Sequence, residues 1–148
     1  MAKHWEDYNI GDRCKGPGRT ISEAMINTIA GFSGHTMFLF WDEDRARDTM
    51  FGGRIAPGLM TLLVMDGLEE QSGLWDEETM IALVGIDGVR IKAPLRAGDT
   101  IRVETEIVAK KETRRPDRGL IIHRNVCRNQ KGEEVAEYQG THLVKRRP

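Results

Sequence analysis

The pattern of apolar and polar positions divides the chain into two regions. Up to about residue 73 apolar residues recur at helical spacing, and from about residue 80 they alternate with polar residues. Ser22 is suited to cap a first helix whose apolar face carries Ile26 and Ile29. Gly31 and Gly34 follow as stop signals, and a shorter helix is expected over residues 42–48.

The third predicted helix carries the strongest pattern. Pro57 fits a first helical turn, where a missing N–H is tolerated. Apolar side chains then occupy nearly every side of the helix as far as Glu69 and Glu70: Leu59, Met60, Leu62, Leu63, Val64, Met65 and Leu68. Such a helix is typical of a buried position rather than of a surface.

The second region predicts antiparallel strands over residues 80–91, 101–107, 120–127 and 135–144, with a hairpin turn at residues 129–132. A sheet that curls around the apolar helix would bury it. The expected fold class is therefore α+β, a curled antiparallel sheet wrapped around one central buried helix. Because such a sheet leaves its edges poorly covered, a homodimer or higher homo-oligomer is expected.

Composition narrows the setting. A length of 148 residues fits one domain, residues 1–148, and a net charge of −1 gives no reason to expect nucleic acid as a partner. The chain has neither a signal-peptide pattern nor the roughly 20-residue apolar run of a membrane span, so no membrane association is expected. Cys14 and Cys127 fit two free thiols in a reducing cytoplasm.

Four segments together resemble one family: residues 6–12, Ser33-Gly34, Phe51-Gly52-Gly53-Arg54-Ile55-Ala56-Pro57-Gly58 and residues 91–100. With consistent spacing over nearly the whole chain, they are similar to the MaoC-like (R)-specific enoyl-CoA hydratases and dehydratases. The resemblance implies a hot-dog fold, a dimer and an acyl-CoA or acyl-carrier-protein thioester as ligand. It implies no metal and no cofactor.

The sequence departs from that family at the catalytic dyad. Members carry an Asp and a His five residues apart after Ser-Gly, and these activate water for addition to an enoyl thioester. Here His35 stands at the Asp position, Phe40 at the His position, and Pro57 replaces the His before the helix glycine. The resemblance therefore implies the scaffold of a hydratase with a divergent site.

Two residues are candidates for catalysis. Free N–H groups at the start of a buried helix can stabilise a negatively charged oxygen, and Gly58, lacking a side chain, would let a thioester carbonyl approach them. His35 can accept a proton near neutral pH and would act as a general base. Alternatively, His35 lines the pocket without doing chemistry, and the sequence does not separate these two roles.

The remaining candidate residues would bind the acyl group. An aromatic run after His35 favours a dry pocket, although core packing would explain one or two of its members equally well. The predicted binding residues are Thr36, Phe38, Phe40, Trp41, Ile55, Ala56 and Pro57. His123 and His142 are expected to pack or to lie on the surface, because no group of residues shows metal-ligand spacing.

Three functions fit these residues. The first is addition or removal of water at an enoyl-CoA by a divergent site. The second is hydrolysis of an acyl-CoA thioester, and the third is acyl-CoA binding without catalysis. A fold alone does not choose among them.

Overall fold

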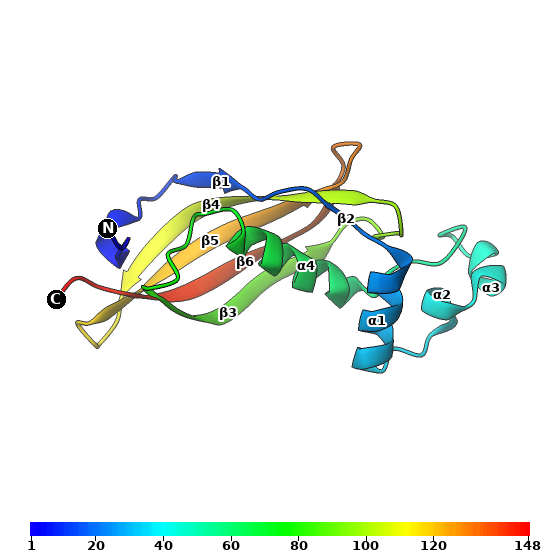
Figure 1. The fold of residues 1–148 in the computed structure, drawn as a ribbon, viewed down its shortest axis with the longest axis horizontal. Helices are drawn as coiled ribbons and strands as arrows, with labels where there is room; N and C mark the ends of the chain where they lie inside the picture. The colour runs from blue at the N-terminus through cyan, green and yellow to red at the C-terminus, as the bar shows by residue number, and fades with distance from the viewer.

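The structure, a computed structural model, describes residues 1–148 and consists of a curled antiparallel sheet with one long helix packed along it. Three shorter helices gather beyond one end of that helix, and both chain termini lie at the opposite end of the sheet (Figure 1). The helices are α1 (Glu23–Ser33), α2 (Phe38–Trp41), α3 (Glu43–Arg47) and α4 (Gly58–Glu70), after a 3-10 turn at Trp5–Asp7.

The sheet has the order β1-β4-β5-β6-β3, with β2 also pairing with β4, and every pair is antiparallel. Its strands are β1 (Arg13–Lys15), β2 (Arg19–Thr20), β3 (Met80–Ile91), β4 (Thr100–Glu112), β5 (Arg118–Arg128) and β6 (Glu134–Lys145). β3 pairs only with β6, so one edge of β3 is free. Register shifts flank Gly85 and Gly88, as expected for glycines inside a strand.

α4 supplies the centre of the main core. Met60, Met65 and Leu68 are buried on it, and they belong to one cluster with residues of β4, β5 and β6 such as Val103 and Tyr138. One stripe of the helix is uncovered in the single chain, because Leu59 is 67% exposed and Leu63 is 57% exposed. The prediction of a central helix is confirmed, and the expectation of burial on every side fails along this stripe.

Most predicted elements are confirmed, with differences at their ends. The Ser22 hydroxyl accepts a hydrogen bond from the Met25 N–H at 3.1 Å and caps α1. Gly34 ends α1 at a φ of 75°, but Gly31 lies inside the helix, so its expected role as a stop signal was wrong. The structure adds α2, β1 and β2, which the sequence pattern did not indicate.

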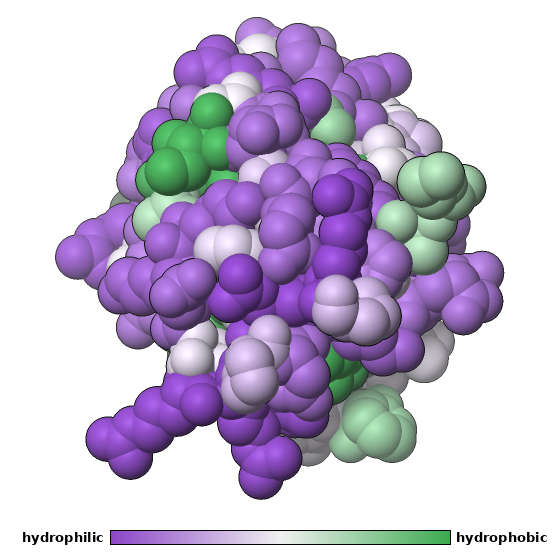
Figure 2. All heavy atoms as spheres, turned by 90° about the vertical axis from the view of Figure 1, so that its left-hand side faces the viewer, coloured by the Kyte–Doolittle hydropathy of each residue, from purple (hydrophilic) through white to green (hydrophobic).

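The end of the sheet that carries the termini is mostly hydrophilic on its surface (Figure 2). Basic residues of the C-terminal tail are paired there with acids: Arg146 Nε lies 2.8 Å from Glu6, and Arg147 contacts Asp7. Both cysteines are free thiols, as expected. None of the helices has the length and apolar character that crossing a membrane requires.

Candidate functional site

Two backbone contacts fix the segment that leads into α4. The Ile55 N–H donates to the Leu39 carbonyl at 3.1 Å, and the Ala56 N–H donates to the Leu95 carbonyl at 2.7 Å. Pro57 follows as the N-cap, with a φ of −53° and no N–H to satisfy. The entry into α4 is therefore held against two other parts of the chain.

The first turn of α4 has N–H groups without a protein acceptor. Met60 donates to the Pro57 carbonyl at 2.9 Å, whereas the N–H groups of Gly58 and Leu59 make no hydrogen bond within the chain. A helix N-terminus carries a partial positive charge, so these groups favour an oxygen with negative charge. This turn can bind a carbonyl oxygen and stabilise it as charge develops.

A cavity of about 320 Å³ opens at this helix end. Its wall is mainly apolar and consists of Leu39, Phe40, Phe51, Ile55, Ala56, Gly58, Thr61, Ile91, Lys92, Ala93, Pro94 and Leu95. A Cβ atom on Gly58 would lie 3.8 Å from its nearest neighbour, Ile91 Cγ1, which is an ordinary contact. Packing therefore does not require a glycine at position 58, and its missing side chain leaves the cavity open to the free N–H groups.

The structure brings together some of the predicted site residues. Phe40, Ile55, Ala56 and Gly58 line the cavity, and Pro57 is buried immediately before it. Residues 91–95, which also line it, lie in a segment that carried the family resemblance, so the sequence did contain a signal for them.

The other predicted residues lie outside the cavity wall. His35 is half-buried, receives or donates a hydrogen bond at 2.5 Å between its Nδ1 and Ser33 Oγ, and packs edge-on against Phe40. Phe40 therefore contacts His35 and also lines the cavity. Thr36 and Trp41 are exposed, and the Phe38 ring lies under the Arg45 guanidinium at 4.1 Å.

A neighbouring cavity of about 240 Å³ is more polar and lies between α1, α3 and the loop before α4. Its main charge, Arg54, is bonded to both Glu23 and Glu43. Hydrogen bonds from Arg54 hold the pKa of Glu43 below its usual value. Arg54 is therefore paired internally, whereas the guanidinium of Arg96, which also lines the cavity, donates to the Phe51 carbonyl.

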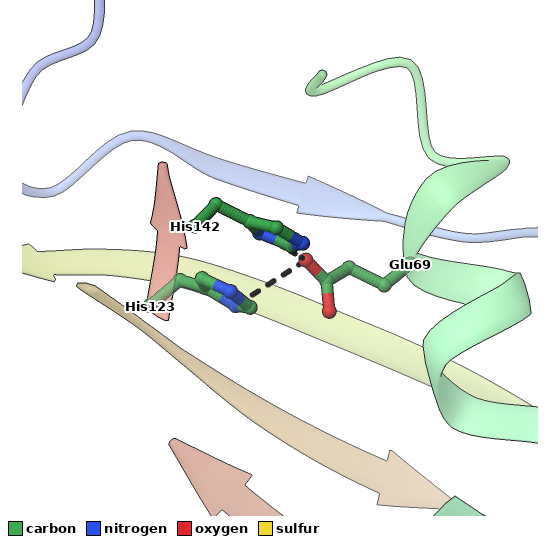
Figure 3. A group of neighbouring side chains, drawn as sticks. All are labelled: Glu69, His123 and His142. Atoms are coloured by element: carbon green, nitrogen blue, oxygen red, sulfur yellow. Dashed lines mark ion pairs between the residues drawn. The ribbon is translucent and has the colours of Figure 1, made fainter. Parts of the chain in front are cut away.

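A second group of polar residues lies buried at the other end of α4. Glu69 Oε1 is 3.3 Å from His123 Nδ1 and 3.8 Å from His142 Nδ1, and the two imidazole rings are stacked at 4.8 Å (Figure 3). The Glu69 carboxylate also accepts hydrogen bonds from Trp75 Nε1 at 2.6 Å, Asn125 Nδ2 at 2.8 Å and the Tyr138 hydroxyl at 3.1 Å.

Burial dominates the protonation of this cluster. It raises the pKa of Glu69 to about 7, although the donors from Trp75, Tyr138 and Asn125 act against that rise. Burial lowers the pKa of His123 to about 3, with a further lowering by His142, and lowers the pKa of His142 to about 4. Both imidazoles are therefore uncharged at neutral pH, and their contacts with Glu69 are not ion pairs there.

The same three residues have the atom types of a metal site, with their ligand atoms within 4.8 Å of one another. Their geometry does not suit one. The ring planes are within 7° of parallel, so nitrogen lone pairs in the two planes do not meet at one point. No pattern along the chain indicated this cluster, because Glu69, His123 and His142 lie on three separate elements, α4, β5 and β6.

The fold places the protein in a structural class. The chain superimposes with a TM-score of 0.84 on a protein from Mycobacterium tuberculosis that is described as having a double hotdog fold. The two are 21% identical, and the superposition covers 99% of this chain and 45% of the other. The expected hot-dog fold is thereby confirmed. Residues 7–124 match the family described as "MaoC like domain", so the chain belongs to this family.

Individual relatives agree with that assignment. The chain is 32% identical to the structure of a MaoC-like dehydratase from Rhodospirillum rubrum, with a TM-score of 0.86 and 98% of each chain covered. It is 31% identical to a monoamine oxidase regulatory protein from Archaeoglobus, with a TM-score of 0.92 and coverages of 98% and 95%. It is also 31% identical over 111 residues to Protein MaoC of Klebsiella aerogenes, covering 75% of this chain.

The curated relatives are longer than the matched region. The chain spans 32% of Protein MaoC of Klebsiella aerogenes. It spans 59% of 3-hydroxyacyl-thioester dehydratase Z of Mycobacterium tuberculosis, to which it is 29% identical over 60% of its own length.

Proposed function

We propose that this protein adds water to, or removes water from, an acyl thioester carried by CoA or by an acyl-carrier protein. The observation that carries the proposal is the pair of free N–H groups at Gly58 and Leu59 on an apolar cavity. Two relatives with dehydratase in their names support the reaction class. In this reaction the thioester oxygen gains negative charge as the β-carbon is attacked, which is the charge that these donors would stabilise.

The acyl group would lie along the apolar wall formed by Phe40, Ile55 and Ala56, with its carbonyl oxygen directed at Gly58. Thr36, Phe38 and Trp41 lie outside this wall and would contact only a longer acyl or pantetheine chain. His35, which packs against Phe40, would act as the base or shape the pocket, and replacing it separates these roles. Loss of hydration in His35→Ala would assign the base to His35, and full activity would leave it a lining residue.

The protein would act as a homodimer in the cytoplasm, with residues 1–148 as one domain and without a cofactor. The free edge of β3 and the uncovered stripe of α4 support pairing with a second copy. Five apolar residues of β3 are exposed in the single chain: Ile81, Leu83, Val84, Ile86 and Ile91. Exposed apolar strand edges tend to pair, and a second copy would cover them.

A panel of enoyl-CoA and saturated acyl-CoA substrates tests the reaction. We expect the double bond of a short-chain enoyl-CoA such as crotonyl-CoA to be hydrated, which forms the 3-hydroxyacyl-CoA. Release of free CoA from a saturated acyl-CoA would instead indicate a thioesterase. Thermal stabilisation by acyl-CoA without turnover of any substrate would indicate a binding protein.

A further inference from the structure

His142 is placed to act as a base in a cavity beside Glu69. Its Nδ1 is enclosed and makes no hydrogen bond, with Glu69 Oε1 lying 3.8 Å away, whereas its Nε2 is not enclosed and makes no hydrogen bond within the chain. His142 lines a cavity of about 150 Å³ together with Glu69 and residues 80–83 of β3. If Glu69 closes the remaining distance to the inner nitrogen and orients the ring, the outer nitrogen is free to act as a general base.

Glu69 is itself held firmly. Trp75, Asn125 and Tyr138 donate to its two oxygens, and these donors come from the loop after α4, from β5 and from β6. Such support fixes the carboxylate beside the imidazole and prevents it from turning away. Two further carboxyl groups, Asp66 and Glu70, line the same cavity. Its remaining lining is largely apolar, namely Trp75 and the residues of β3.

Within one chain this pair cannot serve the cavity at Gly58. Gly58 and Glu69 lie at opposite ends of α4, and a rise of about 1.5 Å per residue separates them by roughly 16 Å. An acid–base pair must come within hydrogen-bond reach of the reacting water. A contribution from Glu69 and His142 to the Gly58 site therefore requires a second copy of the chain.

β3 connects the two cavities. Its first residues, 80–83, line the Glu69–His142 cavity, and its last residue, Ile91, lines the Gly58 cavity. The free edge of β3 can pair with the β3 of another copy, and a two-fold axis makes this pairing antiparallel. With the axis near Ile86, midway between Ile81 and Ile91, the start of each β3 faces the end of the other.

We propose that each reaction site is composite: one copy supplies the Gly58 amide that binds the thioester oxygen, and its partner supplies the Glu69–His142 pair as acid and base. The proposal rests on the hydratase function proposed above. It assigns a replacement for the missing Asp/His dyad at a different place in the fold and leaves His35 as a lining residue, so a base role of His35 would contradict it. His142 is the catalytic residue of the pair, and Glu69 is a positioning residue.

The step balances without any co-reactant. His142 Nε2 takes a proton from water, and the water oxygen forms a bond to the β-carbon of the enoyl thioester. The electron pair of the double bond then moves to give an enolate, whose oxygen is held by the Gly58 N–H. The proton on His142 is returned to the α-carbon, so that one water has been added and the imidazole is again neutral.

Mixed dimers test the composite site. Gly58→Leu fills the oxyanion cavity, and His142→Gln removes the base, so each homodimer is expected to lose at least 100-fold in kcat on crotonyl-CoA. Random mixing of the two chains makes about half of the dimers mixed, each with one intact site, so about one quarter of the wild-type activity should return. Glu69→Gln mixed with Gly58→Leu should restore activity in the same way, which a merely structural role of Glu69 would not do.

The outcomes separate two kinds of failure. Wild-type protein that hydrates no enoyl-CoA overturns the proposed function and the composite site with it. Active wild-type protein with no recovery on mixing, or with full activity in the His142→Gln homodimer, overturns only the composite site. Circular dichroism and sedimentation confirm that each variant is folded and dimeric, and His142→Asn serves as the second variant if His142→Gln does not fold.

Discussion

A glycine in the first turn of α4 leaves the amide end of that helix open to a ligand. Since a Cβ at Gly58 would meet only Ile91 Cγ1 at 3.8 Å, the position tolerates alanine sterically. The contrast with Gly140 is large, because a Cβ there would lie 2.4 Å from His123 Cε1 and 2.5 Å from its Nε2. One glycine keeps a cavity open, and the other makes room for a buried imidazole.

Gly58→Ala is therefore predicted to separate stability from activity. Replacing a glycine in the middle of a helix with alanine stabilises it by about 0.5–1 kcal/mol, and Gly58 is the first residue of α4, so the free energy of unfolding should rise by less than this or stay unchanged. Hydration of crotonyl-CoA should fall by about tenfold or more, because the methyl group obstructs the donors. Urea unfolding and steady-state kinetics measure the two effects. Gly67→Ala, with open space around the new Cβ in the same helix, is the matched control and should keep full activity.

The buried histidines predict a loss of stability in acid. Their pKa values are lowered from 6.5 to about 3 for His123 and about 4 for His142, so the unfolded chain binds more protons below pH 6.5. Stability should fall by up to about 1.4 kcal/mol per pH unit for each histidine as pH drops from 6.5 toward 4. Glu69 acts oppositely: its raised pKa stabilises the fold below pH 4.5, and this contribution is lost as pH rises through about 7.

Urea unfolding from pH 7 to pH 4 checks this. His142→Gln should reduce the slope of stability against pH by up to about 1.4 kcal/mol per unit, since one titrating group is removed. His4→Gln controls for removal of an imidazole outside the cluster. An unchanged slope in His142→Gln would contradict the burial of a neutral imidazole at this position.

At the scale of elements, long periodic segments were predictable and short ones were not. The 13 residues of α4 and the four strands β3 to β6 carry enough repeats of one period to be recognised. β1 has three residues and β2 has two, and both exist because they pair with β4. No local pattern encodes such pairing, so these strands could not be expected from the sequence.

Part of the candidate site could be predicted from the sequence, and part of it depends on how the elements pack together. The resemblance located Gly58 and the segments that line its cavity, because they are contiguous in sequence. The Glu69–His123–His142 cluster depends on how α4, β5 and β6 pack together, and the nearest two of its members are 19 residues apart along the chain. Sequence spacing detects groups of functional residues that lie within one helix or strand. This cluster has one residue on each of three elements, so spacing does not detect it.

Gly140→Ala tests how β5 and β6 accommodate the cluster. The added methyl group cannot fit against the His123 ring without moving it, and overpacking of this kind costs about 1–3 kcal/mol. Thermal unfolding should show a lower midpoint than in wild type. Gly132→Ala is not a suitable comparison, because its φ of 80° adds strain, so Gly67→Ala again provides the reference.

At the scale of the whole molecule, β3 has a free edge and exposed apolar side chains in the single chain. Val84 is 53% exposed and Ile86 is 45% exposed in the single chain. Val84→Asp with Ile86→Asp is predicted to give a monomer and to abolish hydration, because a composite site needs both copies. Sedimentation velocity measures the assembly state. Ile10→Asp, at an exposed position outside β3, should stay dimeric and active.

The central claim is that the amide end of α4 binds a thioester oxygen, and the backbone amide resonance of Gly58 tests it most directly. Titration of ¹⁵N-labelled protein with butyryl-CoA should shift the Gly58 and Leu59 amide signals, since a hydrogen bond to the carbonyl oxygen changes the environment of these N–H groups. Free CoA at the same concentration should leave both signals unmoved. Binding of butyryl-CoA that shifts other amides and leaves Gly58 in place would contradict the account.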